Sequence, residues 1–147
     1  MTLPSLVLVD DDPRSRLSAL DALRCRFSVE PVPEGEAPLR TVRRQRPAAV
    51  VVALRSMRVA PVVHLCERLR TEPGITPRIV VWNATCVAEL RRLCETRDLA
   101  DAYLEGEVGM GELIEACAAV LRGERPRVEG DRPASRLAAW WRALRRS

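Results

Sequence analysis

Along residues 6–121, short apolar runs alternate with helical apolar patterns, and this alternation limits the possible folds more than any other feature. Five runs have the length of strands: 6–9, 27–32, 48–54, 78–82 and 102–104. Runs without polar alternation are typical of strands buried on both faces of a parallel sheet. Five βα units joined by right-handed crossovers therefore predict a doubly wound α/β domain with the flavodoxin-like strand order 2-1-3-4-5.

The helices between these runs have recognisable starts and apolar faces. Asp12 followed by Pro13 predicts the first helix, with an acceptor at the cap and proline at the first helical position. Leu17, Leu20 and Leu23 follow at helical spacing. Pro61 is expected to open the third helix. The fifth has a clear amphipathic pattern, made by Met110, Leu113, Ile114, Cys117 and Leu121.

Charge divides the chain into a neutral body and a basic tail. Residues 122–147 hold eight Arg against three acidic residues, while the whole chain has a net charge of +4. Glycine and proline between 123 and 133 indicate a linker. We therefore expect a domain over residues 1–123, a linker over 124–133 and a basic amphipathic helix over 134–147.

The tail helix has one apolar face. Leu137, Trp140, Trp141 and Leu144 fall at i, i+3, i+4 and i+7. A helix this short is marginal in isolation, so the apolar face needs a docking surface. Four docking surfaces remain open: the protein's own domain, a partner or second copy, an anionic membrane surface, and nucleic acid. The neutral body argues against nucleic acid, so we expect a protein partner or a homodimer.

Composition narrows the class further. Apolar residues make up 47% of the chain, enough for a core. No stretch approaches the ~20 apolar residues of a membrane span, and no basic region precedes the first apolar run. A soluble cytoplasmic protein is expected. The five cysteines form no C-x-x-C pair and His64 is the only histidine, so neither a metal site nor a cofactor is expected.

Acidic and small residues follow the predicted strands at the edge where such sheets hold their functional sites. Three segments carry the pattern: Leu8-Val9-Asp10-Asp11-Asp12-Pro13, Arg46-Pro47-Ala48-Ala49-Val50-Val51-Val52-Ala53 and Ala100-Asp101-Ala102-Tyr103-Leu104. With these motifs, residues 5–123 resemble the receiver domains of bacterial two-component response regulators.

The resemblance implies a site for phosphoryl transfer, but three of its positions are changed. Asp10 and Asp11 match the acids that hold Mg²⁺ in the family. Ala53 stands at the position of the phosphoryl-accepting Asp, and Asn83 at that of a Ser or Thr. Gly106 replaces the family's Lys, and all 24 basic residues of this chain are Arg. Because phosphoryl transfer depends on neutralising charge, we expect a pseudo-receiver that is not phosphorylated and is not an enzyme.

The resemblance also implies a docking surface. In the family, an aromatic at the position of Tyr103 switches between buried and exposed rotamers; a plain surface aromatic is the alternative here. The face formed by helix four, strand five and helix five is the family's usual contact surface. In this sequence it would include Arg91, Arg92, Glu95, Tyr103, Glu105 and Glu112. The expected function is regulation through protein–protein contacts.

Two other functions remain open. A receiver-like domain could sense a small ligand in the vacated pocket. A phosphatase of the haloacid dehalogenase type also begins with a strand ending in D-x-D, which Asp10 to Asp12 fit formally, but that family also requires a Lys. Asp10 itself is expected either to bind a metal weakly or to be held by backbone donors or an Arg such as Arg14 or Arg55.

Overall fold

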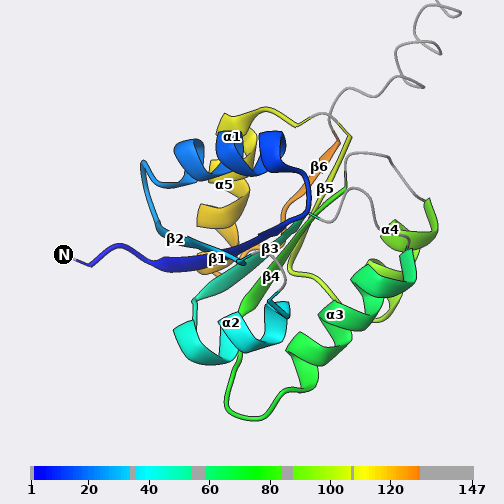
Figure 1. Cartoon of the computed structure of the whole chain (residues 1–147). Coiled ribbons are helices and arrows are strands. Elements are labelled where there is room, and N and C mark those ends of the chain that lie inside the picture. Colours follow the sequence, from blue (N-terminus) through cyan, green and yellow to red (C-terminus); the bar gives the residue numbers. More distant parts are fainter. Residues whose placement is uncertain (1, 34–35, 54–58, 84–87, 107, 130–147) are drawn as a thin grey trace, which may run out of the picture.

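One parallel β-sheet organises the chain (Figure 1). The structure, a computed structural model, describes residues 2–33, 36–53, 59–83, 88–106 and 108–129. Within these residues the strand order is β2-β1-β3-β4-β5-β6. The strands are β1 (Ser5–Asp10), β2 (Ser28–Pro31), β3 (Ala49–Ala53), β4 (Arg78–Asn83), β5 (Ala102–Glu105) and β6 (Arg127–Glu129). The helices are α1 (Pro13–Leu23), α2 (Pro38–Gln45), α3 (Val59–Thr71), α4 (Ala88–Thr96) and α5 (Met110–Leu121). The predicted fold class and the order 2-1-3-4-5 are confirmed.

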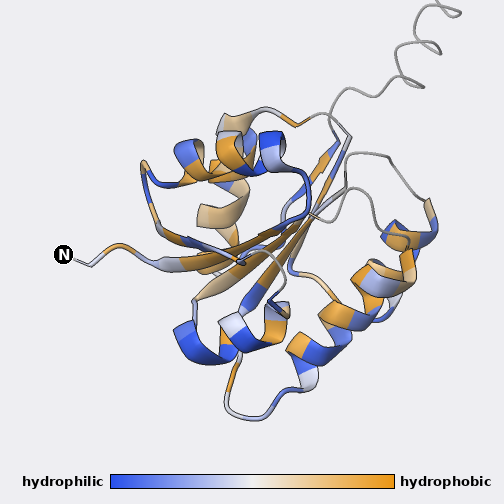
Figure 2. Cartoon of the chain, in the orientation of Figure 1, coloured by the Kyte–Doolittle hydropathy of each residue, from blue (hydrophilic) through white to orange (hydrophobic). Residues whose placement is uncertain are grey.

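The sheet lies between two helical layers. Helices α1 and α5 cover one face, and α2, α3 and α4 cover the other. Strand residues alternate between the two cores: Leu8 and Val51 face α1 and α5, whereas Val9 and Val52 face the other layer. In Figure 2 apolar colour predominates along the central strands β1 and β3, whereas the helices carry both polar and apolar residues. Burial on both faces explains why these strands read as continuous apolar runs.

The first helix begins as the sequence predicts. Asp12 caps α1 by accepting a hydrogen bond from the Arg14 amide at 3.0 Å, and Pro13 is its first residue. The predicted apolar face is only partly right, because Leu20 and Leu23 are buried while Leu17 is 64% exposed. Ala19 takes the buried place instead, where a small side chain lets α1 lie close to the sheet.

The third helix begins earlier than predicted. It starts at Val59, two residues before Pro61. Proline is tolerated in the first turn because amides there have no partner within the helix, so it does not have to mark the first residue.

The main difference from the sequence prediction lies after α5. Residues 127–129 form β6, which pairs in parallel with β5, inside the segment predicted to be a linker. Only Val128 is apolar in this strand, and Pro126 and Gly130 flank it, so the local sequence has the composition of a turn. The tail residues Leu137, Trp140, Trp141 and Leu144 lie outside the described residues.

Three of the cysteines that the structure describes belong to the cores. Cys66, Cys94 and Cys117 are buried, and Cys25 is exposed. Burial raises the pKa of Cys66 and of Cys117 to about 12, and that of Cys94 to about 11. These three thiols are therefore protonated at neutral pH. None of the described helices is long and apolar enough to cross a membrane.

Two leucines of α1 provide a matched test of this packing. Leu23→Ala should lower the free energy of unfolding by about 2–5 kcal/mol, because it leaves a cavity in the core under α1 and α5. Leu17→Ala, the same change on the exposed face, should alter it by less than ~0.5 kcal/mol. Urea unfolding at constant pH measures both. Equal losses would show that the two helix faces are not distinguished as described.

Candidate functional site

The carboxyl edge of the sheet gathers the positions that the sequence singles out. Asp10 at the end of β1 is the register partner of Ala53 at the end of β3. Asn83 at the end of β4 is the partner of Glu105 at the end of β5. Gly106 follows directly, with a φ of 82° that favours glycine. Adjacent parallel strands thus bring the predicted acidic-pocket positions to one edge.

The carboxylate of Asp10 is already engaged at this edge. It is 7% exposed. Its Oδ1 accepts a hydrogen bond from the Asp12 amide at 2.9 Å, and its Oδ2 accepts one from the Ser15 hydroxyl at 2.8 Å. The predicted backbone donor to Asp10 is therefore confirmed, and it is the amide of Asp12. Arg55, one of the two Arg residues named as an alternative partner of Asp10, lies outside the described residues.

The hydroxyl of Ser15 is a partner that sequence analysis missed. Ser15 lies in the first turn of α1, which starts immediately behind the strand end. A serine five residues after Asp10 is a weak signal in a sequence. The helix start at Pro13 was predictable, and a helix folding back over β1 carries its first-turn side chains to the strand end. Asp11, by contrast, is exposed on the bend between β1 and α1.

At the centre of the edge, Ala53 presents only a methyl group. It is fully buried in the core beneath α1 and α5, next to Asp10 in the register. A methyl group offers no lone pair for a phosphoryl group or a cation. Within the described part of the chain, no three His, Cys, Asp or Glu side chains are grouped as metal ligands.

Tyr103 is an interior residue. It is 5% exposed and packs in the core between the sheet and α3 and α4. The alternative of a plain surface aromatic is therefore wrong. In a parallel sheet, every second residue of β5 points to the layer that contains α4, and Tyr103 and Glu105 share that side. The structure thus shows Tyr103 in a buried position.

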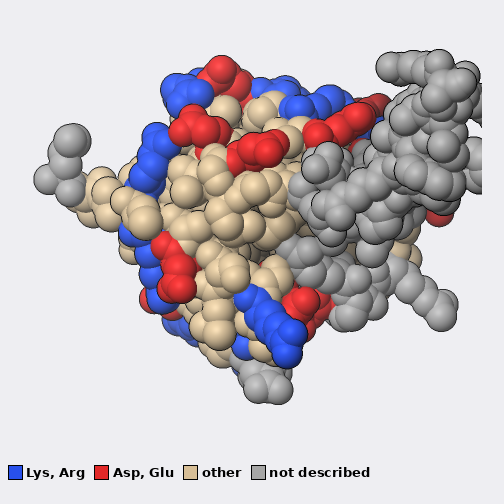
Figure 3. Space-filling view, turned by 90° about the horizontal axis from the view of Figure 1, so that it is seen from above, with Lys and Arg blue, Asp and Glu red and all other residues tan. Residues whose placement is uncertain are grey.

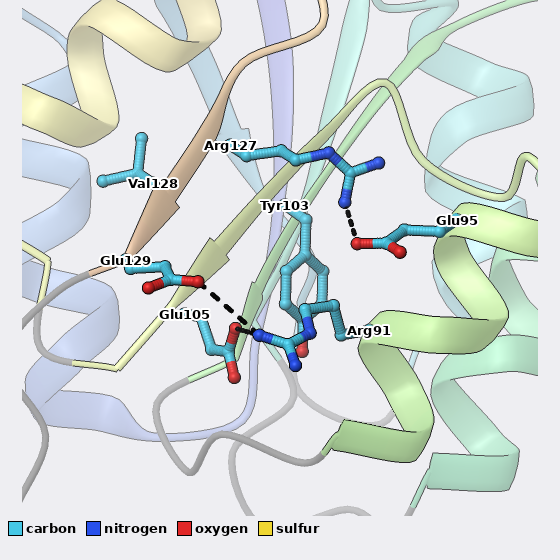
Figure 4. Close-up of a pocket in the computed structure, with 7 residues that line it drawn as sticks. All are labelled: Arg91, Glu95, Tyr103, Glu105, Arg127, Val128 and Glu129. Carbon is cyan, nitrogen blue, oxygen red and sulfur yellow. Dashed lines mark hydrogen bonds and ion pairs between the residues drawn. The ribbon is translucent and has the colours of Figure 1, made fainter. Parts of the chain in front are cut away.

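A groove lies between α4 and the edge of the sheet, where the docking surface was expected. Figure 4 shows Arg91 and Glu95 from α4 facing Tyr103 and Glu105 from β5. Four of the predicted contact residues are thus brought together. The other two do not line this groove: Arg92 is an exposed residue of α4, and Glu112 is exposed in the first turn of α5.

The groove is not open, because β6 forms its outer wall. Arg127 pairs in register with Tyr103, and Glu129 pairs with Glu105. Arg127 donates to Glu95, while Arg91 lies 3.4 Å from Glu105 and 3.5 Å from Glu129 (Figure 4). The chain itself therefore covers the outer edge of β5.

The segment leading into β6 is tied to the turn after α4. Arg125 donates to the carbonyl of Ala100 at 3.0 Å and also hydrogen bonds to the carboxylate of Asp98. That hydrogen bond, strengthened by the charge of Arg125, lowers the pKa of Asp98 below its ordinary value. The pair therefore stays ionised at neutral pH.

The hydrogen bonds of Asp10 can be tested by substitution. Asp10→Ala should lower the free energy of unfolding by about 1–3 kcal/mol, because the Asp12 amide and the Ser15 hydroxyl lose their acceptor. Ser15→Ala removes one of these bonds and should cost about 1 kcal/mol. Thermal and urea denaturation measure the difference. A larger loss for Ser15→Ala than for Asp10→Ala would contradict the assignment.

Comparison with known proteins supports the fold. No protein-family model and no curated protein matches the sequence. Among solved structures, the chain is similar to a response regulator from Thermotoga maritima, with a TM-score of 0.68, 19% identity, and 82% of this chain and 98% of that chain covered. It is similar to a CheY-like receiver domain protein from Methanospirillum hungatei JF-1, with a TM-score of 0.66, 21% identity, and coverage of 83% and 96%. A LuxR-family two-component response regulator from Aurantimonas sp. SI85-9A1 gives a TM-score of 0.62 at 20% identity, with coverage of 97% and 99%. The chain therefore has the fold of response regulator receiver domains.

Proposed function

We propose that this chain is a pseudo-receiver: a regulatory adaptor that works through protein–protein contacts and is not phosphorylated. The observation that carries the proposal is Ala53. It ends β3, lies beside Asp10 in the register and is fully buried at the position where a receiver of the resembled family has its acceptor. Without an oxygen at this position no acyl phosphate can form.

The neighbouring positions support the same proposal. Phosphoryl transfer relies on cations that neutralise the oxygens of the transferred group. No lysine exists anywhere in the chain, and Gly106 stands where the resembled family has one. Asp10 uses both carboxylate oxygens on the Asp12 amide and the Ser15 hydroxyl. A cation would compete with these two hydrogen bonds.

The phosphatase alternative is weakened by Asp12. A D-x-D mechanism needs its second acid directed at a substrate. Here the Asp12 side chain accepts from the Arg14 amide and caps α1. A small-ligand sensor remains the second candidate, since Asp10 and Gly106 lie at the switch-point edge where such folds bind ligands. No contact among the described residues favours a small-ligand sensor over the adaptor.

The surface charges support a protein partner over nucleic acid. Seen from above, Arg side chains and acidic side chains lie interspersed around uncharged surface (Figure 3). A nucleic-acid site is expected to gather positive charge on one face. We propose a cytoplasmic adaptor whose contact surface includes the α4–β5 groove and, beyond the described residues, the tail face of Leu137, Trp140, Trp141 and Leu144.

The absence of phosphorylation is directly testable. With Mg²⁺ and acetyl phosphate, the wild-type chain should show no mass increase of one phosphoryl group, because Ala53 offers no acceptor oxygen. Ala53→Asp alone should also remain poorly phosphorylated, since position 106 still lacks a cation. Intact-mass spectrometry before and after hydroxylamine treatment measures both. A stable, hydroxylamine-sensitive adduct on the wild-type chain would refute the proposal.

The same variant makes a prediction about stability. Ala53→Asp adds a carboxylate beside Asp10 in a buried place, and like charges there raise each other's pKa and oppose folding. The melting temperature should therefore fall without metal and recover with millimolar Mg²⁺, following the linkage between binding and stability. Ala53→Asn, nearly the same size but uncharged, is the control and should gain no comparable Mg²⁺ dependence.

The proposed role of the tail is tested separately. If the tail docks on a partner, replacing Trp140 and Trp141 by Ala should weaken self-association or partner capture while leaving the melting temperature of the domain unchanged within about 1 °C. Sedimentation and calorimetry on the full chain measure the two effects. A large fall in melting temperature with unchanged association would assign the tail to the domain's own core.

A further inference from the structure

We infer that the α4–β5 groove is a docking site for an extended strand, that β6 closes it within the same molecule, and that the strand able to replace it is β6 of a second copy of this chain. The inference rests on the proposed function, because it names a partner for the same surface. The resemblance places contacts on this face but does not include a strand covering it.

The register between β5 and β6 determines how the strand lies in the α4–β5 groove. Arg127, Val128 and Glu129 pair with Tyr103, Leu104 and Glu105 in turn. Paired residues of parallel strands point to the same side of a sheet. Arg127 and Glu129 therefore face α4, while Val128 points to the opposite side and packs against the core beneath α5. The Tyr103 amide adds a hydrogen bond to the Pro126 carbonyl at 3.3 Å.

Residues of the groove pair with the charged side chains at the first and third positions of β6. At the first position, Glu95 accepts from Arg127. At the third position, Arg91 lies 3.5 Å from Glu129 and 3.4 Å from Glu105, a carboxylate that is only 1% exposed. Arg91 thus binds one acid of the sheet and one acid of the incoming strand. The site is complementary to a parallel segment with a basic, an apolar and an acidic residue in that order.

The strand is held weakly enough to exchange. It is three residues long, and the side chain of Arg127 is 57% exposed in its pair with Glu95. Exposed ion pairs contribute little by themselves, and so short a strand gains most from being tethered nearby, here also through the bonds of Arg125 to Ala100 and Asp98. Gly123 precedes it with a φ of 87°, and nothing lies within 4 Å of where its side chain would be. Glycine populates positive and negative φ about equally, so Gly123 is a backbone position of the connection with little conformational restriction.

A second copy is the partner that fits without any new contact. Each copy carries both the groove and the segment that fills it, so reciprocal exchange reproduces every pair seen within one molecule. Exchange of identical elements is a low-cost route to a dimer. In the wild-type chain the tether favours closure within one molecule, since its effective concentration is in the millimolar range.

Charge reversal separates closure within a molecule from exchange between molecules. Two full-length variants are prepared, Arg127→Glu and Glu95→Arg. In each variant alone, like charges meet at the first strand position, so β6 should open more often than in the wild-type chain. When the two are mixed, the groove of each matches the strand of the other. We expect each variant alone to be monomeric through this surface, and the mixture to form a heterodimer in sedimentation velocity.

Amide hydrogen exchange at Tyr103 reports on the strand itself, because this amide donates to Pro126. Exchange should be about fivefold to tenfold faster in either variant, given the size of a surface ion pair and the added repulsion. Protection should return in the mixture. The double variant carrying both changes in one chain restores the pair with its charges swapped, and should be monomeric and protected.

Arg122→Glu is the matched control. Arg122 is also 57% exposed and pairs with an acid, Glu124, but it does not line the groove. It should leave the exchange rate at Tyr103 and the sedimentation unchanged. A mixture that stays monomeric while each variant loses protection would overturn strand exchange. If both single variants kept the wild-type protection of the Tyr103 amide, the claim that charge holds β6 in the groove would be overturned. Neither result affects the outcome of the acetyl phosphate test. The adaptor proposal is therefore tested independently of strand exchange.

Discussion

The structure depends on the burial of its central strand on both faces. All five side chains of β3 are fully buried between the two helical layers, and β1 and β4 flank it on either side. A strand in this position tolerates only apolar side chains along its length, and a polar group at its end only where the edge of the sheet can satisfy it. Ala53 extends the apolar strand to its last residue. The same feature that stabilises the sheet therefore leaves the end of β3 without a side-chain oxygen.

The polar groups around the end of β3 have a structural role. Asp10 now joins the end of β1 to the first turn of α1 through Asp12 and Ser15. At the opposite edge of the sheet, Asp101 is similarly engaged: it accepts from the Ile79 amide at 2.8 Å and lies 3.0 Å from Arg70. Both buried acids are satisfied by hydrogen bonds or charge from neighbouring elements, as burial of a carboxylate requires. Each of these two acids connects a strand to a neighbouring helix.

Under the proposed function, regulation comes from protein contacts rather than from a phosphoryl group. The α4–β5 groove joins the buried Tyr103 and Glu105 to α4, and β6 fills its outer side. A three-residue charged strand also protects the sheet from uncontrolled pairing, since short charged edges are poor templates for another chain. Burial of Tyr103 and coverage of β5 belong to one closed arrangement. Detachment of β6 would change both the charge and the shape of the proposed docking surface.

The sequence by itself determined the repeating part of the fold. Continuous apolar runs such as 48–54 and the cap at Asp12 act over a few residues, so the five βα units and their strand order follow from local pattern and known chain handedness. The alanine at position 53 and the absence of lysine are also readable without coordinates. Tertiary structure decided what depends on partners far apart in the chain. Leu17 is exposed because α1 turns Ala19 inward, and the Asp10–Ser15 contact requires the helix to lie over the strand end. Residues 127–129 carry almost no strand signal; they become β6 because β5 offers an unpaired edge and α4 supplies Arg91 and Glu95 at matching positions.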